Sequence, residues 1–113
     1  MSPGRLAELR ARHPTFDGEV TCGDGWFDLL DRLLVELEAA GAKVEDVKQK
    51  WGAMRVGAYG GEGVFELTHA AEIASHKVCE VCGAPGELLW KSPVQTRCEQ
   101  HRGVSAERLY GAR

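Results

Sequence analysis

The sequence lacks the features of a membrane or secreted protein. Its 113 residues contain no asparagine, only 7% aromatic residues, and no apolar run near the about 20 residues of a membrane-spanning helix. The N-terminal segment, M-S-P-G-R-L-A-E-L-R, lacks the apolar core of a secretory signal. We therefore expect a cytoplasmic protein with no membrane partner. Its thiols should stay reduced there, so that cysteines bind metal rather than form disulfides.

Positive charge is also scarce. The formal net charge is −3, and residues 1–41 carry four arginines against eight acidic residues. Residues 42–78 are balanced at five of each sign, and residues 79–113 carry five basic and four acidic residues. No segment has the dense positive charge that is typical of a strong phosphate-backbone binder. The composition therefore leaves nucleic-acid binding open only for the mildly basic C-terminal segment.

Two pairs of metal-ligand residues stand out in that segment. The sequence reads C-E-V-C-G from Cys79 and, with fifteen residues between Cys82 and Cys98, C-E-Q-H from Cys98 to His101. Two close pairs with this separation are typical of a tetrahedral Zn²⁺ site. Three thiolates and one imidazole leave no position for water or substrate, so we predict one structural Zn²⁺.

Hydrophobic periodicity predicts the elements before the metal segment. Apolar residues at helical spacing predict a short helix at 5–12 and a strongly amphipathic one at about 26–40, with Asp24 as its N-cap. The intervening residues 15–25 are interpreted as a loop. Residues 43–59 fit two strands that reverse at 51–53.

Further elements complete the predicted fold. We expect a helix at 64–77, strands at 88–90 and 94–97, and a short helix capped by Ser105 and carrying Leu109 and Tyr110. The fold class is then α+β, with the amphipathic helix packed on a small antiparallel sheet. Residues 1–113 form one domain, in which 1–77 precede a treble-clef-like or ribbon-like zinc module at 78–113. The expected core is Trp26, Leu30, Leu33, Leu37, Val56, Leu67, Ile73 and Trp90.

Two surfaces are candidates for binding. The first is the acidic side of the amphipathic helix, which carries Asp28, Asp31, Glu36 and Glu38. Such a side is ordinarily only solvated, but an acidic face also steers basic partners. The second, for nucleic acid, surrounds the zinc site and consists of Lys91, Arg97, Arg102 and Arg108.

Trp51 lies among Lys48, Lys50 and Arg55, which could indicate a platform on which bases stack. A single-stranded nucleic-acid site normally has more aromatic residues. We therefore interpret Trp51 as a core residue flanked by solvated lysines.

Cys22 is the one cysteine outside the metal motif. It precedes a predicted helix N-terminus, where the helix dipole can lower a thiol pKa. A cysteine nucleophile also needs a histidine and an orienting Asn or Asp, and nothing in the sequence pairs one with Cys22. We interpret it as a small buried residue, with an enzyme that uses Cys22 or an open metal position as an alternative.

Several motifs together resemble a known family. These are G-D-G-W-F-D-L-L-D-R-L from Gly23, V-K-Q-K-W-G-A-M-R-V from Val47, and the two ligand pairs. The chain resembles, over roughly residues 14–102, a family of small, mostly uncharacterised bacterial and phage proteins. Its usual middle motif is V-K-E-K-F-G-G-L-R, so Trp51, Ala53 and Met54 are departures here. The resemblance implies that helix, hairpin and metal segment form one unit, and it supplies no activity.

These observations favour a non-catalytic, zinc-stabilised binding protein that engages a protein partner through its acidic helix. Small acidic proteins of bacteria and phages often act as inhibitors or immunity factors, and this is the class we expect. A nucleic-acid-binding zinc module and an enzyme are the alternatives. No small-molecule substrate is expected.

Overall fold

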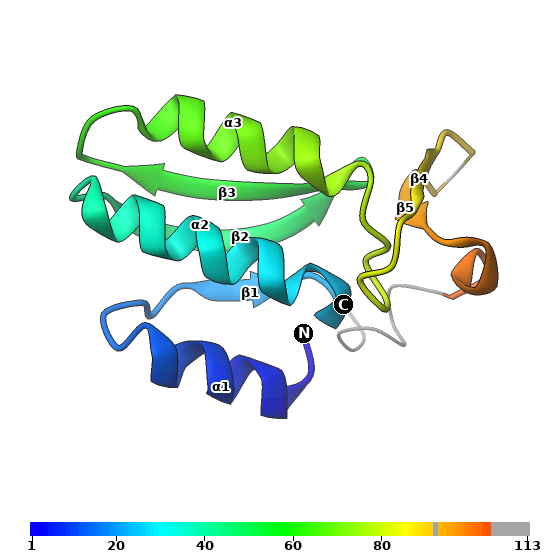
Figure 1. Ribbon diagram of the computed structural model, residues 1–113, viewed down its shortest axis with the longest axis horizontal. Coiled ribbons are helices and arrows are strands. Elements are labelled where there is room, and N and C mark those ends of the chain that lie inside the picture. Colours follow the sequence, from blue (N-terminus) through cyan, green and yellow to red (C-terminus); the bar gives the residue numbers. More distant parts are fainter. Residues whose placement is uncertain (92, 105–113) are drawn as a thin grey trace.

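The computed structural model describes residues 1–91 and 93–104 and has an α+β fold (Figure 1). Its helices are α1 (Pro3–Arg12), α2 (Phe27–Ala39) and α3 (Val64–Ser75), with single 3-10 turns η1 (Asp24–Trp26) and η2 (Glu99–His101). Its strands are β1 (Glu19–Thr21), β2 (Lys43–Lys50), β3 (Ala53–Tyr59), β4 (Glu87–Leu89) and β5 (Gln95–Arg97). None of the helices in the described ranges is long and apolar enough to cross a bilayer.

The main sheet has the strand order β1-β2-β3. β2 and β3 pair antiparallel, with Val47 opposite Val56, and the chain reverses at Trp51 and Gly52 as predicted. β1 pairs parallel to β2, so the interpretation of residues 15–25 as a loop was wrong. A strand of three residues shows no alternation in the sequence, and its parallel partner follows only after the α2 crossover. α2 and α3 lie together on one face of the sheet (Figure 1).

Helix α2 buries the apolar stripe that its sequence predicts. Leu30, Leu33 and Leu37 are at most 2% exposed, and the helix ends before Gly41, whose φ of 79° suits glycine. The predicted N-cap was wrong: the Asp24 carboxylate accepts a hydrogen bond from the Ser2 backbone N–H at 2.6 Å instead. This bond ties the start of α1 to the entry of α2.

The predicted core is mostly confirmed. Trp26 is buried with the α2 leucines, and Val56 and Leu67 are partly buried against them. The prediction that Ile73 and Trp90 belong to the core was wrong, because their side chains are 50% and 77% exposed. α3 turns the side of Leu67 and Ala71 to the core and leaves Ile73 outside, and Trp90 follows β4 at the end of the hairpin.

Candidate metal centre

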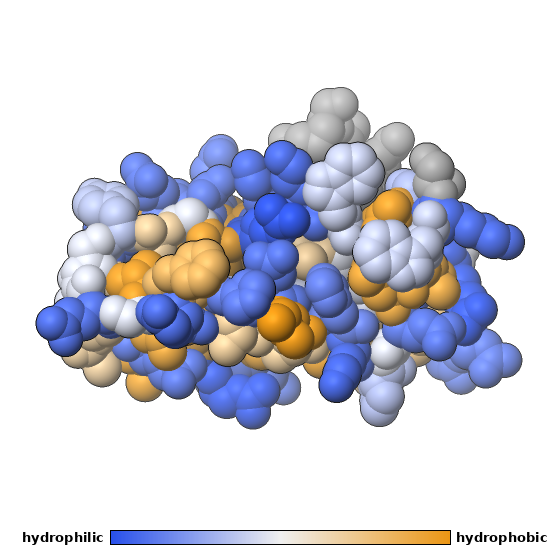
Figure 2. Space-filling model, turned by 90° about the horizontal axis from the view of Figure 1, so that it is seen from above, coloured by the Kyte–Doolittle hydropathy of each residue, from blue (hydrophilic) through white to orange (hydrophobic). Residues whose placement is uncertain are grey.

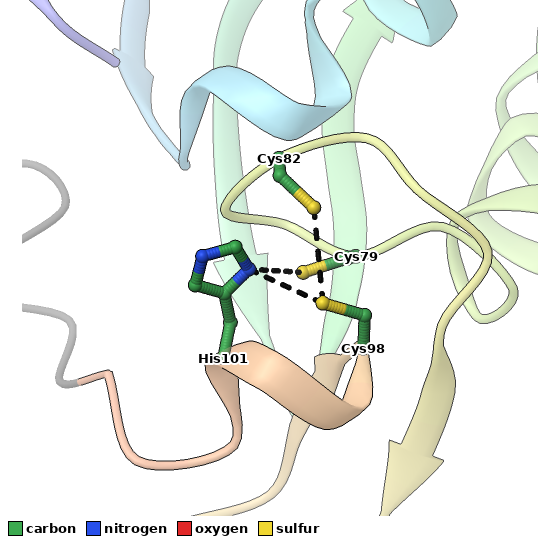
Figure 3. A group of neighbouring side chains, drawn as sticks. All are labelled: Cys79, Cys82, Cys98 and His101. Carbon is green, nitrogen blue, oxygen red and sulfur yellow. Dashed lines mark hydrogen bonds between the residues drawn. The ribbon is translucent and has the colours of Figure 1, made fainter.

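The four predicted ligands lie together, with their side chains pointing toward one another (Figure 3). Their donor atoms are all within 4.8 Å of one another. The Sγ atoms of Cys82 and Cys98 are 3.8 Å apart, and His101 Nδ1 lies 3.2 Å from Cys98 Sγ and 3.9 Å from Cys79 Sγ. The imidazole therefore presents Nδ1, not Nε2, to the three sulfurs.

These separations fit a tetrahedral ion. Bond lengths of about 2.3 Å to sulfur and about 2.0–2.1 Å to nitrogen place two sulfurs about 3.8 Å apart, and sulfur and nitrogen about 3.6 Å apart. The observed distances of 3.8 Å, 3.2 Å and 3.9 Å scatter around those values. The three printed separations therefore suit one tetrahedral ion, and all four donor atoms lie close enough together to share it.

Local backbone geometry presents the ligands in two pairs. Cys79 and Cys82 flank a tight turn, in which the Gly83 N–H donates to the Cys79 carbonyl at 2.9 Å and Gly83 has a φ of 82°. Cys98 is the N-cap of η2, and His101 is the last residue of that turn. The helix predicted from Ser105 lies outside the described residues.

The first two thiols differ in acidity. Burial raises the pKa of Cys79, but backbone hydrogen bonds near Cys98, Cys82 and Val81 outweigh burial and lower it to about 7. For Cys82, a backbone hydrogen bond from Ala84 lowers the pKa. Burial and the neighbouring sulfurs of Cys98 and Cys79 together outweigh it, so the net shift of the pKa is upward. Of these two thiols, Cys79 therefore supplies a thiolate more readily near neutral pH.

The first ligand turn is docked on the N-terminal end of α2. The Gly25 N–H donates to the Glu80 carbonyl at 2.8 Å, and the Trp26 indole N–H donates to the Val78 carbonyl at 2.8 Å. A Cβ on Gly25 would lie 2.1 Å from the Cys79 carbonyl oxygen, so only glycine fits. The G-D-G-W motif therefore joins the helix to the metal segment.

A buried ion pair lies beside the metal ligands. The Arg97 guanidinium donates to the Glu80 carboxylate at 3.0 Å, and their side chains are 2% and 0% exposed. The Gly23 N–H donates to the other Glu80 oxygen at 2.9 Å. Burial raises the pKa of Glu80, and Arg97 opposes that rise. Sequence reasoning missed this pair, because an acidic residue within a zinc-ligand turn ordinarily faces water.

The prediction that Arg97 belongs to a nucleic-acid-binding surface was therefore wrong, because its guanidinium is buried. Lys91 and Arg102 are exposed, and Arg102 pairs with Glu87 at 3.0 Å. Arg108 lies outside the described residues. Only part of the predicted basic surface is thus present on the outside of the metal segment.

The acidic face of α2 is divided between two environments. Asp31 lies 2.6 Å from His13 Nε2 and accepts from Arg12 at 2.9 Å, so α1 already occupies it. Glu38 accepts a hydrogen bond from Thr15 at 3.3 Å. Asp28 and Glu36 are exposed on the outer side of α2.

Cys22 is fully buried. Burial, followed by the nearby Glu80 charge, raises the pKa of Cys22 to about 12. The thiol therefore stays protonated at neutral pH and has no access to a substrate. Its position agrees with the interpretation as a small buried residue.

The site and the fold stand on this geometry alone. Comparison of the chain with models of protein families, with curated proteins and with solved structures finds no match.

Proposed function

We propose that the chain is a non-catalytic binding protein, stabilised by one Zn²⁺, that engages a protein partner through helices α2 and α3. The observation that carries this proposal is an apolar groove between the two helices, in which the core residues Leu33 and Ala71 lie beside the exposed Val35. The metal centre acts as a structural element behind that surface rather than as the site of a reaction.

The ligand set supports Zn²⁺. Thiolate and imidazole ligands select zinc over Mg²⁺ and Ca²⁺, which prefer oxygen. Cys79, Cys82, Cys98 and His101 would complete a tetrahedral shell, and a complete protein shell leaves no position for a substrate or for a reactive water. Both arguments favour a structural role.

The groove is suited to a protein side chain. It has a volume of about 490 Å³ and is lined by Leu29, Val35, Leu67 and the alanines at 70 and 74, among others. Val35 is 57% exposed, and Ile73 and Phe65 on α3 are 50% and 71% exposed. Apolar side chains gather over α3 in Figure 2. Exposed apolar patches with polar borders are typical of protein interfaces.

The border of the groove indicates the partner's charge. Asp31, Glu36 and Arg32 lie along it. Asp31 is already paired with Arg12 and His13, so Glu36 and the exposed Asp28 on the outer side of α2 are the carboxylates left for a partner. Acidic borders favour partners with basic residues around an apolar anchor, and they speed association more than they add affinity. An inhibitor or immunity-type factor that caps a basic protein fits this description.

Affinity capture with matched variants tests the proposal. The tagged protein and its Val35→Ser variant would be used as baits in the cells that make the protein, with Tyr59→Ser on β3 as an equally exposed control. Val35 lines the groove and is 57% exposed, whereas Tyr59 is 55% exposed and does not line it. We expect a basic protein to be captured by the wild type and by Y59S, and to be recovered much less with V35S. Equal recovery by all three baits, or background proteins alone, would count against the proposal.

A further inference from the structure

Two of the three tryptophans lie on the surface. Trp51 is 65% exposed and Trp90 is 77% exposed, whereas Trp26 is fully buried. The interpretation of Trp51 as a core residue was therefore wrong. Exposed tryptophan is uncommon because the side chain carries a large apolar area, so each of these two positions needs a reason.

The turn conformation does not provide that reason for Trp51. Trp51 has a φ of 56° and Gly52 a φ of 78°, which is a two-residue hairpin turn with both residues left-handed. Such turns strongly favour Asn-Gly, and a bulky residue at the first position is strained. Strain that is retained at an exposed position is typical of functional residues.

The two tryptophans line the same groove. A cavity of about 460 Å³ lies between Trp51, Trp90 and Lys50. It adjoins a second cavity of about 540 Å³, which shares Trp90 and is also lined by Lys91 and Arg102. The groove therefore runs from the β2–β3 turn along hairpin β4–β5, away from the α2–α3 groove.

The charge along this groove is positive. The described residues that line the two cavities include three cations and no carboxylate. Glu87 pairs with Arg102 and offsets part of that charge, which leaves Lys50 and Lys91 as the principal cations. An anionic ligand with flat apolar groups is complementary to this combination.

The two tryptophans are also held on a rigid support. Thr96 in β5 donates from its buried hydroxyl to the Gly52 carbonyl at 2.6 Å. A Cβ on Gly52 would lie 2.5 Å from the Leu88 side chain in β4. Turn and hairpin are thus in direct contact, so the indoles need no large rearrangement to receive a ligand.

We propose that Trp51 and Trp90 form a stacking platform for a short single-stranded nucleic acid, with Lys50 and Lys91 on its phosphates. Single-stranded binding sites combine bases stacked on aromatic side chains with cations that follow the backbone, and they need no base-specific hydrogen bonds. This activity goes beyond the proposed protein partner and uses a different surface.

Fluorescence anisotropy with labelled oligothymidylate and oligouridylate tests the proposal, with Zn²⁺-loaded full chain at low salt. Trp51→Asn removes the indole and supplies the residue that the turn prefers, so the variant should unfold at an equal or higher temperature. We expect W51N and W90Q each to weaken binding about tenfold. Trp90→Phe retains an aromatic face and should lose less than W90Q.

The salt dependence of binding distinguishes phosphate contacts made by the lysines from a general effect of positive charge on the protein. Each phosphate contact on a single strand contributes about −0.7 to the slope of log affinity against log salt. Lys50→Gln should therefore make the slope shallower by about 0.7. Lys43→Gln at the other end of β2 removes the same charge outside the groove and should leave the slope unchanged.

Several outcomes would overturn the proposal. These are no binding of either oligonucleotide at low salt, binding that survives W51N and W90Q together, or equal effects of K50Q and K43Q. Binding of a proline-rich peptide at the two tryptophans without binding of oligonucleotide would assign the groove to a protein ligand instead. None of these outcomes depends on whether the α2–α3 groove binds a protein.

Discussion

At the residue scale, the metal centre depends on a group that is not a ligand. Glu80 lies between Cys79 and Cys82 and joins three separate parts of the chain: it binds Arg97 next to Cys98, and it accepts hydrogen bonds from Gly23 and Gly25 before α2. A buried charge pair adds little net stability in general, but it becomes costly when one partner is removed.

Glu80→Gln should be strongly destabilising. It leaves the Arg97 guanidinium buried without its counter-charge, at an expected cost of about 3–5 kcal/mol in the free energy of unfolding. The double variant E80L/R97M should lose less than the sum of the single variants E80L and R97M, because no uncompensated charge remains. Urea denaturation of the Zn²⁺-loaded proteins measures the free energies of unfolding in this double-mutant cycle. A cost of E80Q below about 0.5 kcal/mol would show that Arg97 is not confined as described.

The Cys/His cluster that could hold a metal was predictable from the sequence, and the buried ion pair was not. Ligand residues must occur at fixed short spacings, which a sequence displays directly. Glu80 and Arg97 are paired only through the fold, and neither shows a local pattern. Trp51 and Trp90 were misplaced because an aromatic residue belongs to the core by default, and only the turn geometry and the hairpin position reveal otherwise.

At the element scale, periodic segments were predicted well and short ones poorly. α2 has a continuous apolar stripe, and the β2–β3 hairpin has alternation with a glycine at its turn. β1 has three residues and pairs with a strand beyond α2, so its register depends on tertiary structure alone. Ile73 was misassigned because α3 has apolar residues on both sides and its core-facing side cannot be chosen from spacing.

Ser75 connects α3 to the hairpin. Its fully buried hydroxyl accepts a hydrogen bond from the Met54 backbone N–H at 2.9 Å and donates to the Glu72 carbonyl at 2.6 Å. Ser75→Ala leaves the Met54 N–H buried and unpaired, so we expect a loss of about 1–3 kcal/mol in unfolding free energy and faster hydrogen exchange at Met54.

Thr68→Ala on the same helix is the matched control. The Thr68 hydroxyl bonds only to the Val64 and Phe65 carbonyls within α3, so its removal orphans no donor. The two variants are compared by thermal unfolding and by exchange at the Met54 amide. If S75A and T68A have the same effect on both, Ser75 does not join the helix to the strand.

At the scale of the whole molecule, the metal segment and the helix–sheet part share buried contacts. The Trp26 indole bonds to Val78, the Gly25 amide bonds to Glu80, and Thr96 bonds to Gly52. Metal binding should therefore be linked to the folding of both parts, not of the C-terminal segment alone. Composition and spacing predicted the α+β class and the metal module, but these long-range contacts and the exposed grooves follow only from the fold.

The most direct test of this account is hydrogen exchange at the Trp26 indole N–H, measured before and after removal of the metal by a chelator, with metal content read by native mass spectrometry. We predict one Zn²⁺ per chain. We also predict that chelation abolishes protection at Trp26 and at the Gly23 and Gly25 amides, because their acceptors lie in the first ligand turn. A chain that carries no metal, or one whose Trp26 indole stays protected after chelation, would contradict the account.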